Sequence, residues 1–171
     1  MKRTRKSSFA KRFVGGLMTI CFYIYMGFLL YFLFFSDKYG RTTPYTEYHY
    51  NLELFREIKR FLHMGGTDFI INIVGNVGAF IPFGFLVPVM YREQRNDKVI
   101  VGHYIRSFFF VSFLGALFSF FVETTQLLTK VGSFDVDDLF LNTIGVMIGY
   151  IGYVIAKKII GMTEFWEWRK R

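Results

Sequence analysis

The sequence predicts an all-α, polytopic membrane protein: a four-transmembrane-helix bundle with an outer interfacial amphipathic helix. The first observation is composition. The 171 residues are 53% hydrophobic and 21% aromatic, and the apolar residues come in blocks rather than at amphipathic spacing. The second is block length, since each block holds at most one charged residue and exceeds or approaches the roughly 20 residues needed to cross the hydrocarbon core. The blocks are Phe13–Phe35, Phe69–Tyr91, Ser107–Thr129 and Leu139–Ala156.

The third observation is the distribution of the basic residues. The chain has a net charge of +8. If the N-terminus is cytoplasmic, 15 of the 21 Lys and Arg residues fall on the cytoplasmic side, which is the bias of the positive-inside rule. These residues therefore orient the chain and attract anionic headgroups. A nucleic-acid surface is not expected, because the chain lacks a soluble fold with interleaved stacking aromatics.

The spans divide the chain into three parts. Residues 1–12 form a basic cytoplasmic arm, residues 13–160 form the four-span membrane domain, and residues 161–171 form a basic and aromatic cytoplasmic tail. The first span carries no strong polar group and is interpreted as a retained anchor, too long for a signal peptide. The single cysteine, Cys21, excludes an internal disulfide framework and a thiolate metal site.

The outer loop, residues 36–68, contains the predicted interfacial helix. Asn51 is placed to cap a helix that begins at Leu52, and an apolar stripe follows at helical spacing. The basic residues between the stripe positions have two interpretations. They are either a solvated connector or a basic lip in which Arg56 and Arg60 hold an anionic headgroup or pyrophosphate.

Each of the last three spans has a polar face near its outer end. In the second span Asn72 and Asn76 are one turn apart, and in the third Glu123 and Gln126 follow Ser112, Gly115 and Ser119 on one face. In the fourth span Asp138 and Asn142 precede Gly145 and Gly149, a close-packing pattern. Lipid cannot satisfy such groups, so these faces should turn inward and meet. We expect a polar pocket formed by Asn72, Asn76, Glu123, Gln126, Asp138 and Asn142.

Two alternatives concern the acidic segment between the third and fourth spans. Asp138 is either part of the pocket or an N-cap of the fourth span. Asp135 and Asp137 are interpreted as loop residues that face water.

Four motifs in this order resemble the VanZ-like family of bacterial membrane proteins. They are Asn51-Leu52, Asn72–Asn76 with Phe80–Gly84, Glu123–Gln126, and Phe134–Asp138 with Asn142–Gly145. The resemblance covers residues 50–153. It implies a small multi-pass protein of the bacterial plasma membrane and an association with resistance to teicoplanin. One difference is that relatives often carry an Arg before the Ser-Phe-Asp step, where this chain has Gly132 and its nearest base is Lys130.

Three functions are compatible with such a pocket. The first is binding of membrane lipids or a lipid-linked cell-wall precursor, which alters the cell surface without chemistry. The second is an enzyme acting on a lipid phosphate or headgroup, with Glu123 as general base, Asp138 with Asp135 and Asp137 holding a divalent cation, and the asparagines orienting an oxyanion. Against it, the chain has no known hydrolase motif. The third is a small transporter, for which four spans are few.

Overall fold

The computed structural model describes residues 3–35, 45–90 and 100–159. Four helical segments are long and apolar enough to cross a membrane: Gly16–Phe35, Gly66–Met90, Tyr104–Thr129 and Val136–Lys158. The all-α, four-span prediction is therefore confirmed. The elements in chain order are α1 (Arg3–Phe35), β1 (Tyr50–Asn51), α2 (Arg56–Met64), α3 (Gly66–Phe69), the π-helical turn η2 (Ile70–Val74), α4 (Gly75–Met90), α5 (Ile100–Thr129), β2 (Phe134–Asp135) and α6 (Val136–Ile159).

Three predicted segments fall wholly or partly outside the described residues. These are the first part of the outer loop (residues 36–44), most of the cytoplasmic loop (91–99) and the tail (161–171). The predicted basic arm is mostly helical, because α1 begins at Arg3. The arm and the first span are therefore one continuous helix.

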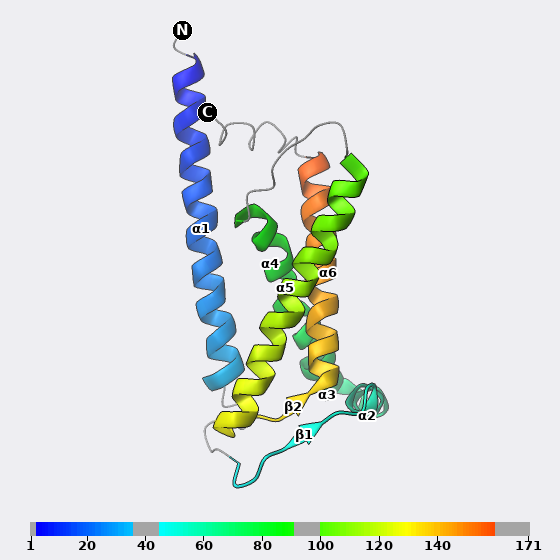
Figure 1. Cartoon of the computed structure of the whole chain (residues 1–171). Helices are drawn as coiled ribbons and strands as arrows, with labels where there is room; N and C mark the ends of the chain where they lie inside the picture. The colour runs from blue at the N-terminus through cyan, green and yellow to red at the C-terminus, as the bar shows by residue number, and fades with distance from the viewer. Residues whose placement is uncertain (1–2, 36–44, 91–99, 160–171) are drawn as a thin grey trace.

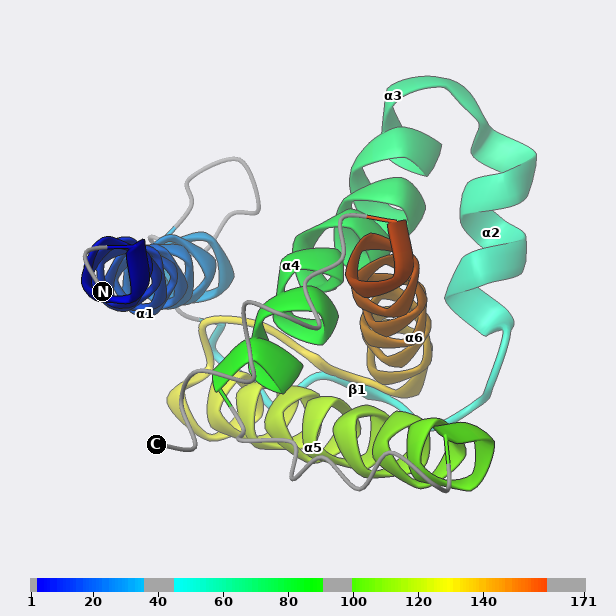
Figure 2. The same ribbon diagram turned by 90° about the horizontal axis from the view of Figure 1, so that it is seen from above.

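The four long helices bring their ends together in two groups (Figure 1). The first residues of α1 and α5 and the last residues of α6 lie at one end, which we call the α1 end, and α4 runs toward this end but stops short of it. The short elements α2, α3, β1 and β2 lie at the other, the α2 end. Figures 1 and 2 show α2 lying across the axes of the long helices, as expected for a helix in the plane of an interface.

The tightest packing joins α4 to α6 through glycines. A Cβ atom added at Gly84 would lie 2.0 Å from the Val146 carbonyl oxygen, and one at Gly149 would lie 2.0 Å from that of Ile81. At Gly145 the distance to the Val77 carbonyl oxygen would be 2.2 Å. The two backbones therefore touch directly, which confirms the close packing predicted from Gly145 and Gly149. Val146 and Phe80 are fully buried beside this seam.

The helix α1 packs on the edge of this core. Between Gly16 and Phe35 most apolar side chains are exposed, as in Tyr23 and Phe28, while Leu29 is buried against the other helices. The Tyr25 hydroxyl donates a hydrogen bond of 2.7 Å to the Ala79 carbonyl of α4. A helix with so much exposed apolar surface is expected to contact lipid along most of its length.

The interfacial helix begins at Arg56, not at Leu52 as predicted. Asn51 does not cap it. Instead, the Asn51 Oδ1 accepts the backbone N–H of Glu53 at 3.1 Å and closes a local turn, while β1 pairs in parallel with β2. The chain then passes through Phe55 at φ 67°, a left-handed conformation, before the helix starts. A helix therefore forms in this loop, but it starts four residues later than predicted, and Leu52 and Phe55 of the predicted stripe precede it.

Candidate functional site

A group of carboxylates is buried at the α2 end of the bundle. The exposed fractions of Glu123, Asp135 and Asp137 are 2%, 8% and 1%. The prediction that Asp135 and Asp137 face water was therefore wrong. Asp135 belongs to β2, which pairs with β1 so that Tyr50 is aligned with Phe134 and Asn51 with Asp135. Buried carboxylates require hydrogen-bond donors, so their partners decide what each one does.

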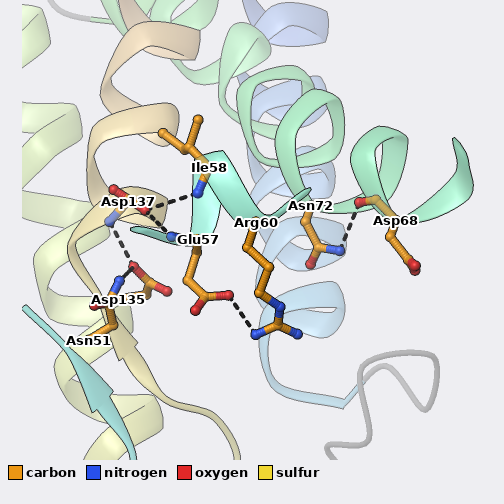
Figure 3. Close-up of polar contacts among 8 residues, drawn as sticks. All are labelled: Asn51, Glu57, Ile58, Arg60, Asp68, Asn72, Asp135 and Asp137. Carbon is orange, nitrogen blue, oxygen red and sulfur yellow. Dashed lines mark hydrogen bonds and ion pairs between the residues drawn. The ribbon is translucent and has the colours of Figure 1, made fainter. Parts of the chain in front are cut away.

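Asp137 holds the first turn of α2. Its Oδ1 accepts the backbone N–H of Phe55 at 2.5 Å, and its Oδ2 accepts the N–H groups of Glu57 at 2.8 Å and Ile58 at 3.1 Å. These are among the N–H groups that a helix leaves without an internal partner. Figure 3 shows the carboxylate between α6 and the start of α2. Among the described residues, no side chain next to α2 caps it, and Asp137 of α6 takes that role.

Asp135 caps its own helix. Its Oδ1 accepts the Asp137 N–H at 2.8 Å, the geometry of an N-cap for α6, and also the Asn51 amide at 3.0 Å. Burial raises the pKa of Asp135 above 3.8, the two hydrogen bonds oppose this, and the nearby Asp137 and Glu57 charges add to the increase. The N-cap role considered for Asp138 therefore belongs to Asp135.

Glu123, the proposed general base, lies in α5 facing this segment. Its Oε2 accepts the backbone N–H of Asp135 at 3.1 Å. The contact joins α5 to β2 immediately before α6 begins. One oxygen of Glu123 is thus used to hold the backbone.

The other predicted pocket residues bond in pairs between helices. The Asn76 amide of α4 donates to Asp138 of α6 at 2.5 Å, and the Asn142 amide of α6 donates to the Ser119 hydroxyl of α5 at 2.9 Å. The Gln126 amide donates to the Leu33 carbonyl near the end of α1 at 2.7 Å. Within the described part of the chain, the buried Asn142 Oδ1 has no hydrogen-bond partner. The polar faces of α5 and α6 therefore turn inward, and they form successive contacts rather than one shared cluster.

Asn72 does not join these contacts. It lies in η2, and its amide donates to the Asp68 carbonyl of the preceding turn at 2.9 Å. A π-helical turn contains an extra residue, so the spacing that would place Asn72 and Asn76 on one face does not apply here. Figure 3 shows Asn72 beside Asp68, apart from Asp135 and Asp137.

The basic residues of α2 lie outside the buried group. Arg56, Lys59 and Arg60 are exposed, and Arg60 forms an ion pair with Glu57 at 2.9 Å. The Arg60 guanidinium also lies 5.2 Å from the centre of the Phe61 ring. The exposed charge on α2 is compatible with both interpretations, a solvated connector and a basic lip.

Two of the residues predicted to hold a divalent cation, Asp135 and Asp137, act as helix caps. Among the residues that the structure describes, no three His, Cys, Asp or Glu side chains are grouped to hold a metal ion. Both oxygens of Asp137 and one of Asp135 accept hydrogen bonds from N–H groups, which a cation would displace. These carboxylates cap helices instead.

Two residues of the site were not predicted. Asn51, which is 8% exposed, bridges β1 to Asp135, and the only signal for it was its place in the first family motif. The second is Lys130, noted above only as the base nearest to Gly132; its Nζ donates to the Thr46 carbonyl at 2.9 Å and lies 4.8 Å from the Tyr48 ring centre. Lys130 therefore holds the segment that leads into β1.

Comparisons with known proteins agree with the motifs. A search of curated proteins and a search of solved structures each returned no match. A model of the VanZ/LLP1 family matches residues 22–157. The match extends further toward the N-terminus than the 50–153 expected from the motifs and takes in much of α1, the helix that receives the Gln126 hydrogen bond. The chain therefore belongs to the VanZ/LLP1 family.

Proposed function

We propose that this protein binds an anionic lipid or lipid-linked envelope component at the α2 end, without catalysing a reaction. The supporting observation is that α6 holds the first turn of α2, while the basic side chains of α2 stay exposed. Asp137 holds the first turn through three backbone N–H groups. Arg56 and Lys59 form no hydrogen bond or ion pair through their side chains with any residue that the structure describes, and both are exposed.

The exposed apolar residues of the same segment suit an interface. Phe55, Leu62 and Met64 are 41%, 56% and 54% exposed. In a helix parallel to the membrane plane such side chains enter the boundary between headgroups and acyl chains. Cations beside them then lie at the depth of lipid phosphates, where Arg forms bidentate hydrogen bonds.

The orientation follows from the charge bias. In a four-span topology with a cytoplasmic N-terminus, 15 of the 21 basic residues fall on the cytoplasmic side, as the positive-inside rule expects, and the α2 end then faces outward. We therefore place the protein in the bacterial plasma membrane with cytoplasmic termini and α2 in the outer leaflet. Its ligand would be an envelope lipid or a lipid-linked cell-wall precursor.

The alternative is an enzyme with Glu123 as general base, favoured by the burial of an ionisable side chain in a membrane-spanning helix. A general base needs a lone pair directed at the substrate. One oxygen of Glu123, Oε2, already accepts the Asp135 N–H, which leaves fewer lone pairs for a substrate. Incubation of the protein in nanodiscs with envelope lipid extract distinguishes the two, since only the enzyme would convert a lipid in a Glu123-dependent manner.

Binding is tested with farnesyl pyrophosphate as a short lipid-linked probe, added to the purified chain in neutral nanodiscs. Each exposed cation is expected to contribute about 1 kcal/mol, or about fivefold in affinity. Arg56→Gln and Lys59→Gln should each weaken binding by that amount, whereas Glu57→Gln, which releases Arg60 from its ion pair, should strengthen it. Equal affinity in all four proteins would contradict a site on α2.

Resistance is tested in cells. If the bound component is the target of lipoglycopeptides, expression of the chain should raise the teicoplanin concentration needed to stop growth. The double variant of Arg56 and Lys59 should lose this effect while it accumulates in the membrane at the normal level. If that variant still confers resistance, the resistance does not depend on the charges of α2.

A further inference from the structure

A second binding site is suggested at the opposite end of the molecule, between α5 and α6. An open groove of about 410 Å³ lies there, and residues of both helices line it, among them Tyr104, Ile105, Phe109, Ile151 and Ile155. Its lining is entirely apolar side-chain surface, and its walls are open toward the lipid, since Ile105, Phe109, Ile151 and Ile155 are 50–65% exposed. Figure 1 shows that these parts of α5 and α6 lie at the α1 end.

The floor of this groove is fixed. Tyr150 is 2% exposed, its hydroxyl donates to the Tyr104 carbonyl at 3.1 Å, and its ring contacts Phe108 edge to face at 5.8 Å. The hydrogen bond joins α6 to α5 across the base of the groove. The shape is thus set by the protein and does not depend on an occupant.

A cation stands at the mouth of the groove. The Lys157 Nζ lies 5.0 Å from the centre of the Tyr104 ring, which lines the groove, and 5.7 Å from that of Tyr153. The aromatic rings hold the ammonium at this position through cation–π attraction. An apolar groove with the Lys157 ammonium at its end matches a lipid in shape and charge. One acyl chain would lie along the groove, and a phosphate would lie at its end.

We propose that this groove binds an anionic glycerophospholipid of the leaflet at the α1 end, with an acyl chain between α5 and α6 and the phosphate at Lys157. A second copy of the chain fits less well. Helices associate in membranes through small residues, whereas this groove is walled by Ile, Phe and Tyr. Two copies would also bring Lys157 and Lys158 of each close to those of the other. Because acyl chains are as apolar as the groove, selectivity should come from the headgroup.

The test uses the full chain in detergent and native mass spectrometry with phosphatidylglycerol or phosphatidylcholine of identical acyl chains. The wild type should retain phosphatidylglycerol preferentially. Lys157→Gln should reduce that preference about fivefold, equivalent to about 1 kcal/mol. The matched control is Lys158→Gln, which removes the same charge from an exposed neighbouring position and should leave the preference intact.

A second variant tests the groove itself. Ile151→Trp fills the groove from a lipid-exposed position, so it should lower retention of both lipids without unfolding the protein. Equal effects of the two lysine variants would indicate diffuse surface charge and overturn the proposal. A dimer that dissociates on Ile151→Trp would assign the groove to a second copy and also overturn it.

Discussion

Asp137, the second residue of α6, accepts the backbone N–H of Glu57 at 2.8 Å and so caps a helix that lies 80 residues earlier in the chain. Two further N–H groups of the same turn bond to this carboxylate. The Asp137→Ala variant would leave these three partly buried N–H groups without an acceptor. We predict a loss of about 2–3 kcal/mol in the free energy of unfolding, the scale of a lost cap with a charged acceptor.

The effect should be concentrated in α2, which carries three trypsin sites. In Asp137→Ala, cleavage after Arg56, Lys59 and Arg60 should accelerate, because proteolysis follows the population of the opened segment. Glu53→Ala, in the exposed turn before α2, is the control and should change cleavage little. If both variants are cleaved at the wild-type rate, Asp137 does not hold α2 in place.

The raised pKa of Asp135 predicts a specific pH dependence. In the folded state the Asp135 carboxyl binds a proton more readily than in the unfolded chain. Asp135 therefore contributes stability at low pH, and this contribution is lost as the pH rises from 3.8 through the raised pKa of the folded state. Asparagine is an equally good N-cap. Asp135→Asn should therefore gain thermal stability relative to the wild type as pH rises across that window, measured by circular dichroism. A constant difference between the two proteins over the window would contradict the assignment.

The glycines of α6 offer a matched pair. At Gly149 a Cβ would lie 2.0 Å from the Ile81 carbonyl oxygen, whereas at Gly152 the nearest atom, in the Phe85 ring, would be 3.8 Å away. Gly149→Ala must separate α4 from α6 and should cost about 1–3 kcal/mol. Gly152→Ala makes an ordinary contact and should stay within about 0.5 kcal/mol of the wild type. Thermal unfolding in detergent measures both.

The number and order of the spans could be predicted because hydrocarbon imposes a length and an apolar composition that are visible in the sequence. The inward faces of α5 and α6 followed from the same argument, and Ser119, Glu123 and Asn142 are all buried. These predictions use spacing within one helix. They do not require the packing partners of the helix to be known.

The burial of the acidic segment could not be predicted from the sequence, because it depends on contacts between distant parts of the chain. The two-residue strands β1 and β2 are too short to give a periodic signal, yet their pairing brings Asn51 beside Asp135. The start of α2 was placed too early because its cap, Asp137, comes from α6. Asn72 was placed in the pocket because the sequence gives no sign of the π-helical turn that moves it.

The contact between Asn76 and Asp138 joins the first turns of the tightly packed helices α4 and α6. Both side chains are half-buried, so the hydrogen bond should couple the two residues energetically. In a double-mutant cycle of Asn76→Ala and Asp138→Ala, we expect a coupling energy of about 0.5–2 kcal/mol in the free energy of unfolding. Pairing Asn76→Ala with Asp135→Ala provides the control, because no hydrogen bond joins those two residues among the described contacts. Coupling in the first cycle but not in the second would show that Asp138 holds α4 against α6. Additive losses in both would mean that Asp138 has another principal role, and the site assigned to it would need to be reconsidered.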